Sequence, residues 1–158
     1  MHRFFDIKMK FDLEIRNIQS SKRIILPFLC TYPRSFGRVE SIIDTGAPTT
    51  VISASDGIRL RLSFDNFEST KPLKGVGRGE IPCLLINNFK ITLHSNNNER
   101  KEFSFPVVAV DVPTLRKFGE DALNQASMLP TLIGLDFLKL NNLKLFVDLQ
   151  NNIAYLEE

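Results

Sequence analysis

Apolar and charged side chains alternate without exception from Phe5 to Ile15, with apolar residues at the odd positions and charged residues at the even ones. Side chains two positions apart share one face of a strand, so this pattern predicts one or two strands that bury one face. An ordinary half-buried strand is the interpretation that we favour over a binding edge. Residues 23–32 form a more continuous apolar run, which predicts a second strand, and Pro27 within it indicates an edge or a bulge.

Short apolar runs separated by turn residues continue through the middle and the end of the chain. The strands predicted from these runs cover residues 83–86, 89–93 and 103–110, with turns at Asn87–Asn88 and at residues 95–98. They form a β-meander. Residues 143–149 and 153–156 predict a terminal hairpin.

Helices are predicted for two segments in the last third of the chain. Apolar residues recur at helical steps over residues 114–126, which predicts an extra helix in an insertion over residues 112–128. A short helix is predicted over residues 136–140, beginning just after Gly134, and Asp136 is expected to cap it. The fold class is therefore expected to be mainly β.

Length and composition describe a globular chain. Its 158 residues are enough for one domain with a substantial core, and 43% apolar with 24% charged residues is typical of soluble proteins. The net charge of +2 with scattered basic residues gives no reason to expect a nucleic-acid partner. No stretch approaches the roughly 18 apolar residues of a membrane span and no signal peptide is recognisable, so we expect a cytoplasmic protein without membrane contact.

The residue types that usually bind metals are scarce. Cys30 and Cys83 lie within apolar runs and are expected to be buried thiols that need no disulfide. His2 and His94 are too few and too far apart in the sequence for a metal site. We therefore expect neither a metal nor another cofactor.

The candidate catalytic residues lie in the segment 42–53, which is the central feature of the sequence. Two isoleucines precede Asp44, Thr45 and Gly46, and β-branched residues resume at Thr49, which predicts a strand, a tight loop and a second strand. A carboxylate beside apolar residues is costly unless it is hydrogen-bonded or used in chemistry. After the second strand, residues 58–62 fit either a short helix or an extended segment.

A second feature, Leu132-Ile133-Gly134-Leu135-Asp136, lies far downstream. Together with Ile42-Ile43-Asp44-Thr45-Gly46-Ala47 it resembles the retropepsin-like aspartic proteases, in which an Asp-Thr-Gly-Ala loop carries the catalytic carboxylate and a later apolar-apolar-Gly segment packs against it. The resemblance covers residues 23–156, and residues 1–22 are then an N-terminal amphipathic strand segment of the same single domain. It implies the acid protease fold, a closed β-barrel with a flap hairpin.

The resemblance also implies roles for particular residues. Asp44 would be catalytic, Thr45 would tie two loops together across a dimer axis, and Gly46 would leave room for substrate backbone, with Ala47 completing the loop. Ile133 and Gly134 would support this loop from behind.

Three glycines within residues 75–79 would form the flap, with Gly75, Val76 and Gly77 near the substrate. A plain hairpin turn is the alternative interpretation. A phosphate-binding loop is disfavoured, because no Gly-Lys-Ser or Gly-Lys-Thr sequence follows.

One carboxylate cannot both activate a water and protonate a peptide carbonyl. Because no second Asp-Thr-Gly or Asp-Ser-Gly occurs, the second carboxylate would come from another chain, which predicts a homodimer with one Asp44 from each subunit. The expected function is an aspartic endopeptidase acting on peptide or protein substrates. The alternatives are a non-catalytic peptide-binding or dimerisation module of the same fold, and a small β-barrel with an accidental motif.

The chain departs from the viral members of the family at two places. Pro48 and Thr49 replace carboxylates that bind substrate backbone, and Leu135 replaces an arginine that pairs with them. The resemblance is therefore closer to cellular, non-viral members.

Overall fold

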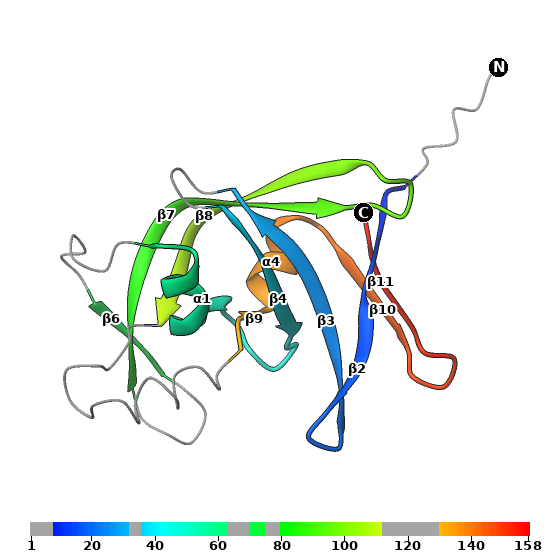
Figure 1. Cartoon of the computed structure of the whole chain (residues 1–158), viewed down its shortest axis with the longest axis horizontal. Helices are drawn as coiled ribbons and strands as arrows, with labels where there is room; N and C mark the ends of the chain where they lie inside the picture. The colour runs from blue at the N-terminus through cyan, green and yellow to red at the C-terminus, as the bar shows by residue number, and fades with distance from the viewer. Residues whose placement is uncertain (1–7, 32–35, 63–69, 75–79, 112–129) are drawn as a thin grey trace.

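The chain forms a mainly β structure, shown as a computed structural model in Figure 1, which describes residues 8–31, 36–62, 70–74, 80–111 and 130–158. The strands are β1 (Lys10–Asp12), β2 (Glu14–Ile18), β3 (Ser21–Cys30), β4 (Gly37–Ile43), β5 (Val51–Ile52), β6 (Thr70–Lys74), β7 (Glu80–His94), β8 (Arg100–Asp111), β9 (Leu132–Ile133), β10 (Lys144–Asp148) and β11 (Ile153–Glu157). The helices within the described residues are α1 (Ala54–Arg59) and α4 (Leu135–Leu140). The predicted fold class is confirmed.

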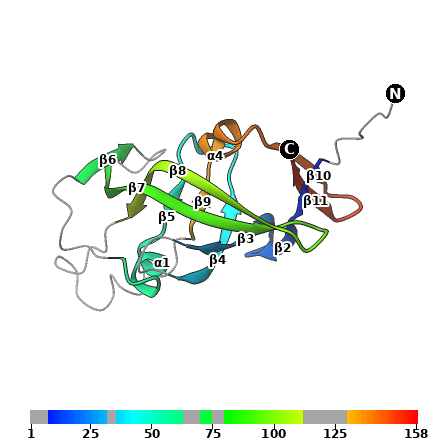
Figure 2. The same cartoon turned by 90° about the horizontal axis from the view of Figure 1, so that it is seen from above.

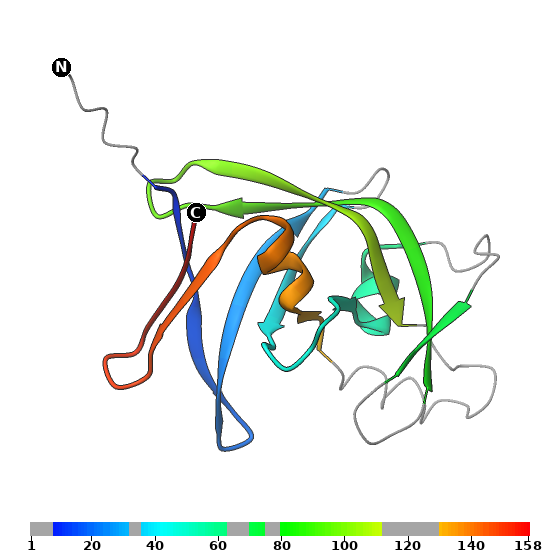
Figure 3. The same cartoon turned by 180° about the vertical axis from the view of Figure 1, so that it is seen from behind.

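Two sheets contain these strands. The larger one has the order β2-β3-β4-β9-β5-β8-β7-β6, and an additional pairing of β3 with β7 joins β3, β4, β9, β5, β8 and β7 into a closed ring. The smaller sheet has the order β1-β11-β10 and brings the two ends of the described chain together. It lies at the opposite end of the molecule from the β6–β7 pair (Figure 3).

The N-terminal strands follow the predicted alternation. The pattern is divided between β1, which pairs with β11, and β2, which pairs with β3. Pro27 lies where one edge of β3 is unpaired, because the pairing with β2 ends at Ile25 and the pairing with β7 begins at Leu29. A proline lacks the N–H that a neighbouring strand would need there, so the predicted edge position is confirmed.

A cluster of phenylalanines holds α4 against the barrel. Phe137 of α4 is fully buried, stacks on Phe105 at 5.1 Å between ring centroids, and meets the ring of Phe103 edge-on at 5.6 Å. Phe103 in turn meets Phe11 of β1. Aromatic contacts of this kind fix a helix that is too short to be stable alone. In the view of Figure 2, α1 and α4 lie on opposite sides of the molecule.

The turn predicted at Asn87–Asn88 is wrong. Both residues lie inside the continuous strand β7, and the register with β8 is the same on either side of them. Asn88 adopts a positive φ of 55°, which asparagine tolerates, and lies between the paired positions Asn87–Val107 and Phe89–Phe105, where Pro106 of β8 has no N–H to give. The hydrogen-bond ladder is interrupted at Asn88 alone, so a sequence that resembles a turn lies within a continuous strand.

The other predicted turns and the terminal hairpin are confirmed. A turn at residues 96–97 separates β7 from β8, and β10 pairs with β11 along their whole length. Of residues 58–62, for which a helix and an extended segment were both open, Ile58 and Arg59 form the end of α1, whose N-cap is Ser53 and whose C-cap is Leu60. Cys30 and Cys83 are buried thiols, as expected.

Some expectations lie outside the described residues, including the insertion helix over 114–126 and the first part of the N-terminal alternation. Among the described helices, neither is long and apolar enough to cross a membrane. The described residues also contain no group of three His, Cys, Asp or Glu side chains that could hold a metal ion.

A small charge cluster joins β2 to β4 across β3. The guanidinium of Arg16 donates to Glu14 at 2.7 Å and to Glu40 of β4 at 2.9 Å. These hydrogen bonds hold the pKa of both carboxyls below the usual glutamate range. All three side chains are substantially exposed, so solvent screens the cluster and limits its contribution to stability.

Candidate active site

Asp44 stands at the end of β4, where β9 fixes its backbone. The two strands are parallel, with Ile42 opposite Leu132 and Ile43 opposite Ile133. The N–H of Asp44 donates to the carbonyl of Ile133 at 2.9 Å. Because β9 also pairs with Val51 of β5, this two-residue strand lies between the strands that enter and leave the Asp44 loop.

The loop itself is a tight turn around the Asp44 side chain. The N–H of Ala47 donates to the Asp44 carbonyl at 3.1 Å, and the N–H of Gly46 donates to Oδ1 of the Asp44 carboxylate at 2.9 Å. Asp44 is half-buried, whereas Thr45 and Gly46 are exposed at the tip. One carboxylate oxygen is thus held by the backbone, and the loop tip faces outward.

Gly134 packs directly against this loop. A Cβ added at this position would lie 2.7 Å from the carbonyl oxygen of Ala47 and 2.8 Å from the carbonyl carbon of Thr49. Both are backbone atoms, so no side-chain rotation could make room. The N–H of Leu135 donates to the same Ala47 oxygen at 2.9 Å. The absence of a side chain at Gly134 is what allows α4 to begin against the Asp44 loop.

The capping role expected for Asp136 is correct only in part. The N-cap of α4 is Gly134, and the Asp136 carboxylate instead accepts two hydrogen bonds from Thr50, from its N–H at 2.9 Å and from its hydroxyl at 2.6 Å. It also accepts from the N–H of Phe137 at 2.8 Å. The carboxylate thus binds one amide at the helix start and also both donors of Thr50, which is fully buried and whose N–H needs a partner.

Thr50 is therefore a site residue that the sequence analysis did not single out. Its hydroxyl accepts from the N–H of Gly134 at 3.0 Å while donating to Asp136. The hydroxyl thus joins the segment after Asp44 to the segment around Gly134. The only signal in the sequence was a threonine following an Asp-Thr-Gly loop, which alone has many interpretations.

The segment expected to be a flap is flanked by paired strands. Leu73 of β6 lies opposite Ile81 of β7, and Lys74 lies opposite Glu80, so residues 75–79 connect the arms of an antiparallel hairpin. Gly75, Val76 and Gly77 themselves lie outside the described residues.

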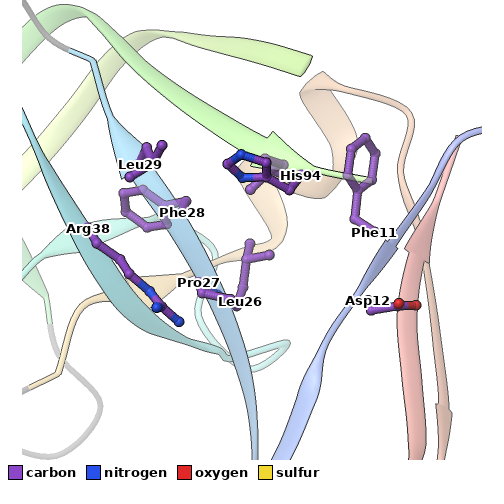
Figure 4. Close-up of a pocket in the computed structure, with 9 residues that line it drawn as sticks. Phe11, Asp12, Leu26, Pro27, Phe28, Leu29, Arg38 and His94 are labelled. Atoms are coloured by element: carbon purple, nitrogen blue, oxygen red, sulfur yellow. The ribbon is translucent and has the colours of Figure 1, made fainter. Parts of the chain in front are cut away.

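A separate pocket of about 210 Å³ lies away from the Asp44 loop, between β1, β3, β4 and the end of β7 (Figure 4). Phe11, Leu26 and Phe28 line it with buried apolar surface, and Arg38 and His94 belong to its exposed lining. No residue of the Asp44 loop lines this pocket. It is therefore not a part of the candidate site.

Comparison with known proteins supports the fold through structure alone. No protein-family model matches the sequence, and no curated protein matches it. A retropepsin-like aspartic protease from Rickettsia conorii has a similar structure, with a TM-score of 0.57 and 15% identity over 95% of this chain and 92% of that one. EIAV protease complexed with the inhibitor HBY-793 is similar with a TM-score of 0.50 and 17% identity, covering 84% of this chain and all of that one.

The retroviral protease-like domain of Ddi1 from Leishmania major also matches, with a TM-score of 0.44 and 23% identity over 82% of this chain and 86% of that one. The fold is that of the retropepsin-like aspartic proteases, and the resemblance expected from the sequence is confirmed at this level. A non-viral protein, from Rickettsia conorii, is among the structures that share it.

Proposed function

We propose that this protein is a homodimeric aspartic endopeptidase whose catalytic carboxylates are the two copies of Asp44. The observation that carries the proposal is a half-buried carboxylate on a glycine loop, hydrogen-bonded to the Gly46 amide and supported by β9 within a retropepsin-like fold. A scaffold without catalysis has no need to present a carboxylate in this way.

Each Asp44 supplies half of the chemistry. One carboxylate takes a proton from the attacking water, while the other, protonated, donates to the carbonyl oxygen of the peptide bond. Two carboxylates at close range cannot both ionise, so the pair shares one proton and titrates as a unit. The activity is therefore expected to be bell-shaped in pH. Thr45, exposed beside Asp44, is proposed to bind the opposite loop across the dimer axis.

The substrate is proposed to be an extended peptide that binds as an added strand between the β6–β7 hairpin and the Asp44 loop. Pro48 and Leu135 stand where viral members of the family have charged side chains. Leu135 is 45% exposed at the start of α4, next to the Ala47 carbonyl that its own N–H binds. We therefore expect peptides with apolar rather than charged side chains near this position.

The edge strand β10 is proposed as the dimer contact. Among the described strands it pairs only with β11, and Phe146 at its centre is 46% exposed and stacked on Tyr155. Antiparallel self-pairing about Phe146 would place Lys144 opposite the partner's Asp148. Hydrogen bonds from Asn151 lower the pKa of Asp148 and keep it ionised, so the two edges are complementary in charge as well as apolar at the centre.

Cleavage of a mixed peptide library, followed by mass spectrometry from about pH 4 to 7, tests the catalytic proposal. Asp44→Asn is expected to abolish every cut, whereas Asp12→Asn, the same change at an exposed aspartate of β1, is expected to leave cleavage intact. No Asp44-dependent cut from a folded, dimeric protein would refute the endopeptidase and favour a non-catalytic peptide-binding module.

Sedimentation equilibrium tests the dimer contact. Phe146→Lys would place two positive charges face to face at the centre of the contact, so we expect it to weaken dimerisation at least tenfold, about 1.4 kcal/mol. Val107→Lys is the matched control, because Val107 is 48% exposed on β8, outside the terminal sheet. Equal dimerisation of both variants would show that β10 is not the contact.

A further inference from the structure

A buried polar cluster lies at the start of β9, outside the Asp44 loop. The side chain of Thr131, which is fully buried, accepts a hydrogen bond from the N–H of Ser53 at 3.0 Å and donates one to Oδ2 of Asp56 at 2.7 Å. Asp56 is in the first turn of α1. One threonine hydroxyl therefore connects the residue before β9 to the helix that follows β5.

The Asp56 carboxylate accepts hydrogen bonds from three side chains. Oδ2 also accepts from the hydroxyl of Ser53 at 3.1 Å, and Oδ1 accepts from the guanidinium of Arg59 at 2.7 Å. The Asp56 side chain is only 17% exposed. Hydrogen bonds to an ionised carboxylate are shorter and stronger than neutral ones, and low exposure protects them from water.

A simple helix-capping role does not account for this arrangement. In a capping box, the acidic side chain in the first turn reaches back to the backbone N–H of the N-cap residue. Here the Ser53 N–H binds the hydroxyl of Thr131, and that hydroxyl binds Asp56. Thr131 is thus inserted into the capping box of α1, so the carboxylate holds β9 as well as its own helix.

Thr131 links this cluster to the Asp44 loop through its backbone. Its carbonyl accepts from the N–H of Ile42 at 2.9 Å, two residues before Asp44. The next residues of β9 provide the Ile133 carbonyl that binds the N–H of Asp44. Because β9 has only two residues, the hydrogen bonds at its ends add substantially to the pairing that holds it between β4 and β5.

Two carboxylates therefore hold the two ends of β9. Asp136, through Thr50, holds the end at Gly134, as described above. Asp56, through Thr131, holds the beginning. Asp56 and Asp136 follow Asp44 by 12 and 92 residues in the sequence, and each acts on the backbone around Asp44 through one threonine side chain.

We propose that Asp56 is a positioning residue for Asp44, acting through Thr131 and β9. The catalytic meaning of this inference rests on the proposed function, whereas the structural coupling does not. Removing the Asp56 carboxylate or the Thr131 hydroxyl releases the start of β9 and loosens the backbone at Ile42 and Asp44.

Amide hydrogen exchange measured by NMR on the full-length protein tests the coupling without reference to activity. Thr131→Val and Asp56→Ala are expected to speed exchange of the Ile42 and Asp44 amides about tenfold, the loss expected for one hydrogen bond to a charged group. The amide of Ile91, in the β7–β8 ladder, serves as the reference for global stability.

Two control variants separate positioning from general destabilisation. Arg59→Gln removes the ion pair at Oδ1 but keeps the bond to Thr131, and Thr131→Ser keeps the hydroxyl, so neither is expected to change exchange at Ile42 or Asp44. If Asp56→Ala does not fold, Asp56→Asn, which keeps one acceptor oxygen and loses the charge, is expected to speed exchange by a few fold.

The outcomes distinguish this inference from the proposed function. Faster exchange at Ile42 and Asp44 with unchanged exchange at Ile91, together with a lower kcat and an unchanged KM for peptide cleavage, supports both. If the variants show the same exchange pattern but the wild-type protein cleaves no peptide, the coupling is supported and the protease is refuted. Exchange that rises equally at all three amides, or at none, overturns the positioning role.

Discussion

Gly134→Ala is expected to destabilise the protein more than any other glycine-to-alanine change among the described residues. The added Cβ would lie 2.7 Å from the oxygen of Ala47 and 2.8 and 2.9 Å from two backbone atoms of Thr49. The backbone at Gly134 has φ −94°, which alanine adopts freely, so the cost arises from these contacts and not from the dihedral angles.

The magnitude follows from two terms. Forcing backbone atoms apart in a packed interior costs about 1–3 kcal/mol, and losing the 2.9 Å hydrogen bond from Leu135 to Ala47 costs about 1 kcal/mol more. A total of about 2–4 kcal/mol corresponds to a fall in Tm of about 5–15 °C for a chain of this length. Because Asp44 shares this backbone, cleavage activity is expected to fall as well.

Urea denaturation and calorimetry of Gly134→Ala beside Gly37→Ala provide the assay. At Gly37 the added Cβ would lie 2.8 Å from Cδ2 of Leu60, the end of a flexible side chain that can move, so we expect a cost below about 1 kcal/mol. The change in unfolded-chain entropy is shared by the two variants and cancels in the comparison. Equal stability of the two variants would refute the packing argument.

Three further predictions concern other parts of the structure. Thr50→Val removes the 2.6 Å bond to Asp136 and leaves the Gly134 amide unpaired, so it is expected to cost about 2–3 kcal/mol by urea denaturation, with Thr50→Ser close to wild type. Arg16 lowers the pKa of Glu14 and Glu40, so their stabilising effect is complete above the ordinary glutamate pKa of 4.5 and is lost as the pH falls through the lowered values. Arg16→Gln is therefore expected to be slightly less stable than wild type at neutral pH and low salt, with the difference shrinking as the pH falls below the ordinary glutamate pKa; a constant difference would contradict this assignment. Asn142 has φ 51°, so Asn142→Ala is expected to lower the free energy of unfolding by about 1 kcal/mol and Asn142→Gly to leave it nearly unchanged.

The elements of the fold were predictable where local pattern and tertiary context agree. The alternation around Phe11 identified strands because one of their faces rests on the core. The same reasoning failed at Asn87 and Asn88, because two asparagines in succession are typical of a turn. Asn88 has the positive φ of a turn residue, yet both residues lie inside the long strand β7. The long partner strand β8 keeps β7 continuous, and that partner is invisible to a local reading of the sequence.

The candidate site was predictable only in part, and for a related reason. Asp44 and Gly134 carry a recognisable motif, but the side chains that hold them are joined over 86 residues between Thr50 and Asp136 and over 75 residues between Asp56 and Thr131. Both carboxylates stand near helix starts, where a local capping role is the natural interpretation. Only the paired geometry shows that each binds a distant segment.

The two-residue strand β9 also sets when the Asp44 loop can form during synthesis. Residues 131–136 follow Asp44 by almost the whole length of the barrel, so a nascent chain that has emerged only through β8 lacks every contact from β9 and α4 to the loop. Contacts between such distant segments form late in folding, because closing a long loop costs entropy before it is repaid. The Asp44 loop therefore lacks its backbone support until β9 and α4, which are synthesised after β8, have emerged and packed against it.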